Sequence, residues 1–156
     1  MFLLYSKKCE YAIRVLAGAL RRGNEQGFQA AEVCRRVRVP EPYARKGLRS
    51  LALKGILKPM RGRSGGYSFA RPAGSISILE IVTAVDGTDS FERCVMGFAE
   101  CGAQKPCPLH HVWKKVKHRY LKELGRKTLS DLKTLGLRGF ETLSAHPKKK
   151  RGRIDH

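Results

Sequence analysis

The stretch of sequence that decides the fold is Ile56-Leu57-Lys58-Pro59-Met60-Arg61-Gly62-Arg63-Ser64-Gly65-Gly66-Tyr67-Ser68-Phe69. Apolar residues stand at both of its ends and glycines crowd its middle, a pattern typical of two strands joined by a tight turn. Glycine accepts positive φ angles without steric cost, so the chain can reverse its direction at this tip. We therefore predict a β-hairpin over residues 56–69.

Three short helices are predicted before the hairpin. Apolar residues recur at intervals of three and four over residues 5–22, 29–38 and 41–54, as they do on the buried face of a helix. A glycine or a proline stands just beyond the end of each segment, where it would end a helix. Three helices joined by tight turns and followed by a hairpin predict a winged helix-turn-helix.

Further elements are predicted after the hairpin. Ser77 precedes an apolar helical pattern that runs to Val85, and Glu80 stands three residues after it, which together make a capping box. Residues 87–107 lack helical or strand periodicity and are expected to form a loop. Thr128 is expected to cap a last short helix.

A long helix is predicted from Pro108 to Tyr120 or Leu124. Its apolar residues form one stripe, made of Leu109, Val112, Trp113, Val116, Tyr120 and Leu124. Lysine and arginine occupy the opposite face. Because such a stripe needs a second helix to cover it, we expect this helix to pair in a homodimer.

The fold class predicted from these elements is mainly α with a small β-hairpin wing, namely a winged helix-turn-helix plus a long dimerisation helix. We expect a DNA-binding domain over residues 1–72 and a dimerisation region over residues 73–136, which includes a cysteine-rich sensor loop over residues 88–110. Residues 137–156 form a basic tail that is expected to be disordered.

The charge of the chain indicates a polyanionic partner. Lysine and arginine number 32 against 13 aspartate and glutamate residues, a net charge of +19. Such a charge repels itself in a compact protein, so a partner of opposite charge is expected. Nucleic acid is the usual partner, and an anionic membrane surface is the other. Charge alone leaves open a nucleic-acid binder without sequence preference.

Several other classes of protein are disfavoured. No apolar run approaches the roughly 18 residues that a membrane-spanning helix needs. The apolar start of the chain is too short for a signal peptide, so we expect a cytoplasmic protein that does not bind membranes. The sequence offers no nucleophile paired with a base at a useful spacing, so we expect neither an enzyme nor a small-molecule substrate.

The helix that begins at Glu41 is the predicted recognition helix. In a helix-turn-helix, the second helix of the motif enters the major groove and reads base edges near its N-terminus. The polar face of this helix carries Tyr43, Arg45, Lys46 and Arg49. Arginine can bond both O6 and N7 of guanine, so Arg45 and Arg49 are the candidates for base reading, with contact to phosphate alone as the alternative.

The tip of the hairpin is the second predicted contact with DNA. An arginine on a slim hairpin can enter a narrow minor groove, where negative potential is concentrated. The candidate contact residues are Arg61, Arg63, Ser64, Gly65 and Tyr67. A phosphate-binding loop of the nucleotide-hydrolase type is excluded because its Gly-Lys-Ser/Thr ending is missing.

Four stretches of the chain resemble a known family. They are Ser6-Lys7-Lys8-Cys9-Glu10-Tyr11-Ala12, Leu51-Ala52-Leu53-Lys54-Gly55-Ile56-Leu57, Arg61-Gly62-Arg63-Ser64-Gly65-Gly66-Tyr67-Ser68-Phe69-Ala70-Arg71-Pro72 and Pro106-Cys107-Pro108-Leu109-His110. Together they resemble the Rrf-type winged-helix regulators, the group that includes IscR, NsrR and CymR. The resemblance covers roughly residues 3–135 and implies a homodimer with crossed long helices, two wings on a palindromic DNA site, and repression of nearby genes. Ser64 stands where many members have glycine.

Three of the five cysteines indicate a metal centre. Cys94, Cys101 and Cys107 lie in the predicted loop, and His110 follows closely. Thiolates are the usual ligands of iron–sulfur clusters, and histidine can replace cysteine. The spacing is similar to the three-cysteine loop of cluster-binding family members, so we expect a cluster, with the 2Fe-2S type favoured. The other two cysteines lie on helix faces predicted to be buried and are expected to pack in the core.

The ligand set and the cofactor stay open. In some family members an acidic residue from the first helix of the partner subunit completes the cluster, and Glu10 occupies the matching position here, so it competes with His110. Zinc would accept the same three cysteines and histidine, although the closely spaced cysteine pair common in zinc sites is missing. A thiol–disulfide switch and inert thiols are the remaining alternatives. A cluster would make DNA binding respond to oxidation, nitric oxide or loss of iron.

Overall fold

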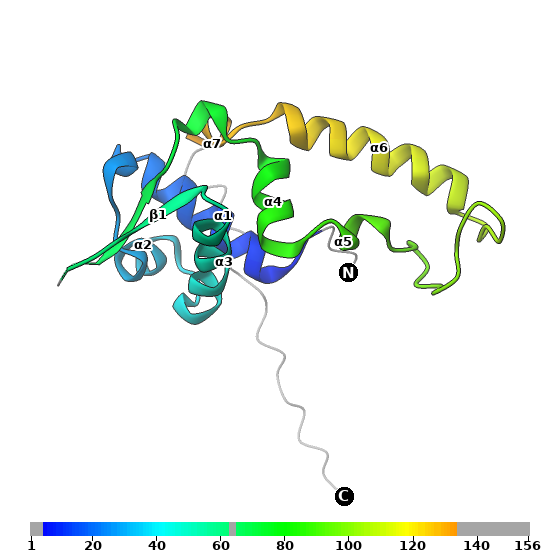
Figure 1. Cartoon of the computed structure of the whole chain (residues 1–156), viewed down its shortest axis with the longest axis horizontal. Coiled ribbons are helices and arrows are strands. Elements are labelled where there is room, and N and C mark those ends of the chain that lie inside the picture. The colour runs from blue at the N-terminus through cyan, green and yellow to red at the C-terminus, as the bar shows by residue number, and fades with distance from the viewer. Residues whose placement is uncertain (1–4, 63–64, 134–156) are drawn as a thin grey trace, which may run out of the picture.

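The computed structural model describes residues 5–62 and 65–133. The elements are α1 (Lys7–Leu20), η1 (Asn24–Gln26), α2 (Ala30–Val37), α3 (Glu41–Leu53), β1 (Leu57–Met60), β2 (Gly66–Phe69), η2 (Ala73–Ser75), α4 (Ile78–Asp86), α5 (Asp89–Glu92), α6 (His110–Arg126) and α7 (Leu129–Lys133). Helices α1 to α3 and the hairpin form a head, whereas the N-terminal part of α6 lies far from the wing, at the opposite end of the molecule (Figure 1). The predicted tail over residues 137–156 lies outside the described residues.

One hydrophobic core joins the head to α4 and α7. Its largest fully buried side chains are Leu16, Leu20, Leu48, Leu51, Ile56, Leu57, Ile76, Ile81, Leu129, Val15, Val33 and Val82. Gly47 of α3 faces α1, and a Cβ atom at this position would stand 2.8 Å from the Cβ of Ala12. A glycine here therefore allows α3 to pack closely on α1.

Two arginines stabilise the head by hydrogen bonds between α1 and α2. Arg14 is 4% exposed, and its guanidinium donates to the carbonyl oxygen of Val37 at 3.0 Å. Arg36 donates in the same way to the carbonyl oxygen of Gly18 at 2.7 Å. Both bonds satisfy helix carbonyls and tie α1 to α2. Both residues contribute to the net charge that indicates a polyanionic partner, but their structural role could not be predicted from charge alone.

The hairpin is confirmed, and its glycines serve two different purposes. Gly62 has a φ of 120°, as the prediction of a reversal at the tip requires. Gly66 is instead required by packing, because a Cβ atom there would stand 2.1 Å from the carbonyl oxygen of Phe28. Phe28 exchanges backbone hydrogen bonds with Tyr67 at 2.8 and 2.9 Å, which joins the hairpin to the segment before α2.

The serine half of the capping box before α4 is confirmed, since the Ser77 hydroxyl accepts from the backbone N–H of Glu80 at 3.1 Å. The Glu80 carboxylate pairs with Arg71 instead of completing the box. The expectation of an unbroken loop over residues 87–107 is wrong at one place, where α5 forms a single helical turn. Phe91 in this turn is 8% exposed and packs against the core. Burial of this ring anchors a turn that has no periodicity for sequence analysis to detect.

A buried carboxylate joins the end of α4 to the beginning of α1. Asp86 accepts from the backbone N–H of Ser6 at 2.6 Å and from its hydroxyl at 2.5 Å. The ammonium of Lys8 lies 3.9 Å from the same carboxylate, whose side chain is 7% exposed. Ser6 also caps α1 by accepting from the N–H of Cys9. The residue that starts the first helix is therefore held by the last residue of α4.

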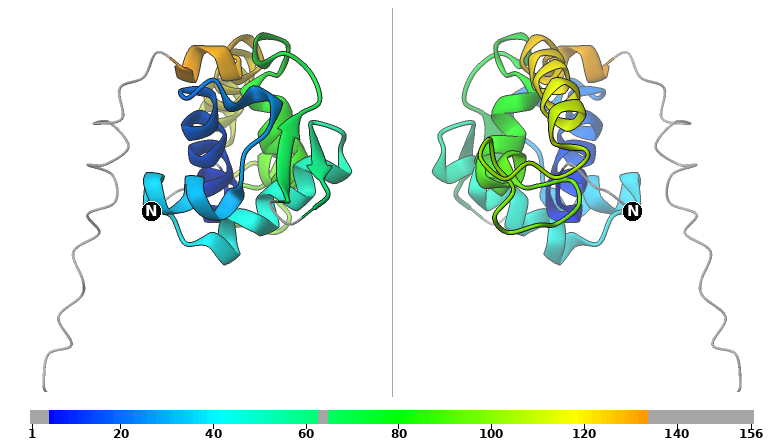
Figure 2. Two further views of the ribbon diagram at one scale, coloured as in Figure 1. Left: turned by 90° about the vertical axis from the view of Figure 1, so that its left-hand side faces the viewer. Right: turned by 90° about the vertical axis from the view of Figure 1, so that its right-hand side faces the viewer.

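The long helix is confirmed, with shifted ends. It begins at His110 rather than at Pro108, which lies in the preceding turn, and it extends to Arg126. Between α5 and α6, residues 93–109, all of which the structure describes, form turns and bends without a helix or strand. We call this stretch the cysteine segment. It faces the viewer in the right-hand view of Figure 2, beside α6.

The close approach at Gly66 gives a test of the fold. We expect Gly66→Ala to lower the free energy of unfolding by about 1–3 kcal/mol, since the new methyl group would overlap the Phe28 carbonyl and push the hairpin off the core. Urea unfolding measures this change. Gly102→Ala is the matched control, because a Cβ atom at Gly102 meets nothing within 4 Å. Equal stability of the two variants would contradict the packing described for the wing.

Candidate DNA-binding surface and cysteine centre

The polar face of α3 is available to a ligand. Tyr43 is 55% exposed, and Arg45, Lys46 and Arg49 are exposed on the same side of the helix. The Nε of Arg45 donates to the Oε1 of Glu41 at 2.5 Å, which holds this arginine along the helix. The buried residues of α3 face α1 and the core instead. All four predicted residues of the recognition helix therefore lie on one free surface.

This surface extends onto α1, which the sequence analysis did not foresee. The rings of Tyr11 and Tyr43 meet edge to face with centroids 6.4 Å apart. The ammonium groups of Lys7 and Lys46 each lie 5.9 Å from one of these rings, over Tyr11 and Tyr43 respectively. The helical pattern of α1 leaves Tyr11 beside the buried face, but only the packing of α1 on α3 brings the two tyrosines together.

The predicted wing contacts divide into three groups. Arg61 and Gly65 are exposed. Arg63 and Ser64 lie outside the described residues. Tyr67 is a correction, because it is only 8% exposed and its ring packs against Phe28 with centroids 6.2 Å apart. This tyrosine packs at the base of the wing, so the prediction that it contacts DNA is wrong.

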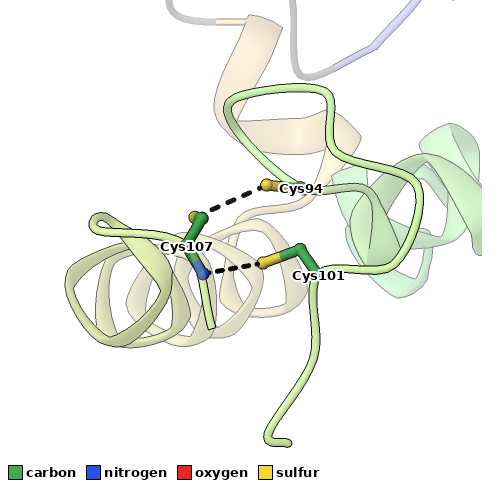
Figure 3. Close-up of side chains that lie close together, drawn as sticks. All are labelled: Cys94, Cys101 and Cys107. Atoms are coloured by element: carbon green, nitrogen blue, oxygen red, sulfur yellow. Dashed lines mark hydrogen bonds between the residues drawn. The ribbon is translucent and has the colours of Figure 1, made fainter. Parts of the chain in front are cut away.

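The three loop cysteines converge. The Sγ atoms of Cys94, Cys101 and Cys107 all lie within 4.8 Å of one another (Figure 3). The Sγ atoms of Cys94 and Cys107 lie 3.6 Å apart. The Sγ of Cys101 accepts from the backbone N–H of Cys107 at 3.5 Å. All three thiols are half-buried, so they can bind a ligand without first unfolding the segment.

Helix α6 supplies the neighbours of this centre. The Nδ1 atom of His110 lies 3.3 Å from the Sγ of Cys101. The indole N–H of Trp113 donates to the carbonyl oxygen of Arg93 at 3.3 Å, directly before the first loop cysteine. Trp113 is half-buried and so anchors the cysteine segment to α6, whereas we had expected it only as an anchor between subunits.

The loop thiols differ in acidity. Partial burial opposes ionisation of Cys94, but hydrogen bonds from backbone N–H groups and from the two neighbouring thiols outweigh it and lower the pKa of Cys94 to about 7. Burial and hydrogen bonding to the thiols of Cys101 and Cys94 raise the pKa of Cys107. Because the thiolate is the form that binds metals, Cys94 is the thiol of this centre that is favoured as a metal ligand near neutral pH.

The remaining cysteines are structural, as expected. Cys9 and Cys34 are 0% and 1% exposed in the core. Burial is the main cause that raises the pKa of Cys9 to about 12 and that of Cys34 to about 11. Glu10, the alternative fourth ligand, forms ion pairs with Lys7 at 2.6 Å and Arg14 at 3.9 Å on its own helix.

The head, its wing and the cysteine centre together define a winged-helix transcriptional regulator. The model of the Rrf2 family, described as an iron-dependent transcriptional regulator, matches residues 5–134. The chain belongs to this family, whose members bind DNA, which confirms the resemblance found in the sequence.

Individual relatives agree with this assignment. The HTH-type transcriptional regulator IscR of Xenorhabdus nematophila is 27% identical over 127 residues, which are 81% of this chain and 77% of that protein. The structure of CymR, the global cysteine regulator of B. subtilis, has a TM-score of 0.66 at 19% identity, covering 85% of this chain and 97% of that one. IscR from T. potens has a TM-score of 0.62 at 23% identity, covering 92% and 91%. These relatives are regulators and not enzymes, as expected.

Among the described residues, no helix combines the length and the apolar character that crossing a membrane would demand.

Proposed function

We propose that the protein is a sequence-specific, DNA-binding homodimer that represses transcription and whose affinity for DNA depends on an iron–sulfur cluster held by the cysteine segment. The observation that carries the proposal is the convergence of Cys94, Cys101 and Cys107 within 4.8 Å, in a chain whose head presents an exposed recognition helix. Since the target is chromosomal DNA, this function requires a cytoplasmic protein.

The proposed DNA interface is the exposed face of α3 together with the wing. Arg45 and Arg49 would read base edges, while Tyr43 and Lys46 would contact the backbone. Arg61, Arg63, Ser64 and Gly65 would enter or flank the minor groove. The proposal treats residues 1–72 as the DNA-binding part and residues 73–136 as the sensing and dimerising part of one molecule. Sequence reading by arginine distinguishes this function from binding by charge alone.

The donor set fits an iron–sulfur cluster. Three accessible thiols lie close together, one of them with a pKa of about 7, and thiolates are the usual cluster ligands. His110 is the favoured fourth ligand because its Nδ1 already touches Cys101. Glu10 of the partner subunit is the alternative. When bound, a cluster would supply sensitivity to oxidants, nitric oxide and iron supply, and the 2Fe-2S type is favoured.

Zinc is the second candidate for the same residues, since it also accepts three thiolates and a histidine. It would hold the cysteine segment in one conformation but would supply no redox chemistry. Iron and sulfide analysis separates the two candidates directly.

The proposed homodimer rests on α6. Leu109, the N-cap residue of α6, is 45% exposed, and Val112 and Val116 in the N-terminal half of the helix are 60% and 50% exposed; the three form one apolar row. Within the described chain, no residue of α6 is fully buried. A second copy of the helix would cover this row, and a two-fold symmetric dimer would read a palindromic site.

The sensing part and the head are mechanically linked in this proposal. The cysteine segment follows α4, whose last residue, Asp86, holds Ser6 at the start of α1. Helix α1 in turn supports α3 at Gly47. A change in the cysteine segment would therefore reach the recognition helix through contacts that exist in the single chain.

Base reading by α3 is tested with a duplex selected by the parent protein from random DNA. We expect Arg49→Ala to weaken binding to this duplex about tenfold or more, since a bidentate arginine–guanine pair is worth about 1–3 kcal/mol. Arg126→Ala on α6 removes the same charge away from α3 and should weaken binding by less than about twofold. Equal losses in both variants, measured by fluorescence anisotropy at one salt concentration, would favour binding by charge alone.

The cofactor is tested by anaerobic purification followed by absorption spectroscopy and analysis for iron, sulfide and zinc. We expect a visible chromophore with matching iron and sulfide in the parent protein, and its loss in Cys101→Ala. Cys34→Ala, which removes a buried thiol outside the centre, should keep it. A colourless parent protein without iron after reconstitution would exclude the cluster and leave zinc or free thiols.

A further inference from the structure

We propose that Cys94 and Cys107 form a reversible disulfide in the metal-free protein, and that this disulfide blocks loading of the centre. The blocking half of this inference rests on the proposed function, because it assumes that the same thiols hold the cofactor. The disulfide itself rests only on the geometry of the cysteine segment.

The sulfur atoms of Cys94 and Cys107 already lie close together. The Sγ atoms of Cys94 and Cys107 lie 3.6 Å apart and face each other in Figure 3. The third thiol is differently engaged, because Cys101 lies 3.3 Å from the Nδ1 of His110 and accepts from the backbone N–H of Cys107. The contact between Cys94 and Cys107, and the other partners of Cys101, therefore favour this pair among the three thiols.

The cysteine segment can close the remaining gap. A disulfide bond is about 2.0 Å long, so the two sulfur atoms must approach by roughly 1.5 Å. The residues between them form turns rather than helix or strand, and nothing lies within 4 Å of a Cβ atom built at Gly97 or Gly102. None of residues 94–107 is buried in the core, so small rotations of this segment need not move a core side chain.

The oxidant is a peroxide, and the reaction balances. One thiol of the pair attacks an oxygen of hydrogen peroxide, the O–O bond breaks, and the products are a sulfenic acid and one water molecule. The second thiol attacks the sulfenic sulfur, the S–O bond breaks, and a second water molecule leaves with the thiol proton. Two thiols and one peroxide thus give one disulfide and two water molecules, and two electrons pass from the sulfur atoms to the peroxide.

The disulfide would prevent the cysteine centre from binding its cofactor. The disulfide removes two of the three thiolates, and Cys9 and Cys34 cannot replace them because both are buried in the core. A protein that has lost its cofactor under oxidative conditions would stay empty until a thiol reductant reopened the pair.

Peptide mapping tests the pairing. The metal-free full chain is treated with one equivalent of hydrogen peroxide, its free thiols are alkylated, and it is cleaved after glutamate. Cleavage at Glu92, Glu100 and Glu123 places Cys94 on residues 93–100 and the other two loop cysteines on residues 101–123. We expect these two peptides to be linked within one chain, and the link to persist in Cys101→Ser but to vanish in Cys107→Ser. Absence of the link, a link between two chains, or loss of the link in Cys101→Ser would overturn the assignment.

Zinc binding tests the block, with the zinc ion alone as the probe. We expect the reduced metal-free protein to bind zinc, the peroxide-treated protein to lose at least about tenfold in affinity, and dithiothreitol to restore it. Undiminished zinc binding after complete cross-linking would overturn the block while leaving the disulfide standing. If the reduced protein binds neither zinc nor a cluster, the proposed metal centre fails and the block fails with it, whereas the peptide map still decides the disulfide.

Discussion

The positions of α1 and α4 relative to each other depend on the buried carboxylate of Asp86. It accepts two hydrogen bonds from Ser6, the residue that caps α1, and it stands directly before the chain turns toward the cysteine segment. A buried carboxylate is costly unless its oxygens are satisfied, so these bonds fix the two helix ends relative to each other. The close packing of α1 on α3 then extends the same constraint to the recognition helix. The end of α4, from which the chain continues through α5 to the cysteine segment, is consequently packed with the head.

Local sequence signals predicted the helices of the head, α4, α6 and the hairpin, but they did not predict α5 or the contacts between elements. The longer helices, the cap at Ser77 and the glycine reversal at Gly62 depend on neighbours within a few residues, so the sequence predicts them. The need for glycine at position 66 and the burial of Tyr67 both arise from Phe28, which lies far away along the chain. A tyrosine beside a basic hairpin tip therefore resembled a DNA contact until the packing of the wing was known.

The cysteine centre shows the same division. Residue type and spacing identified Cys94, Cys101 and Cys107 as candidate ligands, and the structure brings them together. Which sulfur atom contacts Cys107, and which one contacts His110, depends on irregular turns that carry no periodicity. The anchoring of Trp113 to the backbone beside the first cysteine is of the same kind, since an apolar helical stripe predicts burial but not the partner. In this protein, the sequence predicts which residues are candidate ligands, but it does not predict which of their side chains contact one another.

The most direct test of a cofactor-controlled regulator compares the DNA affinity of the loaded protein with that of the metal-free protein, on one selected duplex at one salt concentration and without oxygen. We expect the two affinities to differ by about fivefold or more, the usual range for coupling between two sites. Two preparations of Cys101→Ala, taken through the same loading and chelation steps, should bind alike. Equal affinities for the loaded and metal-free parent protein would contradict the claim that the cysteine centre controls DNA binding.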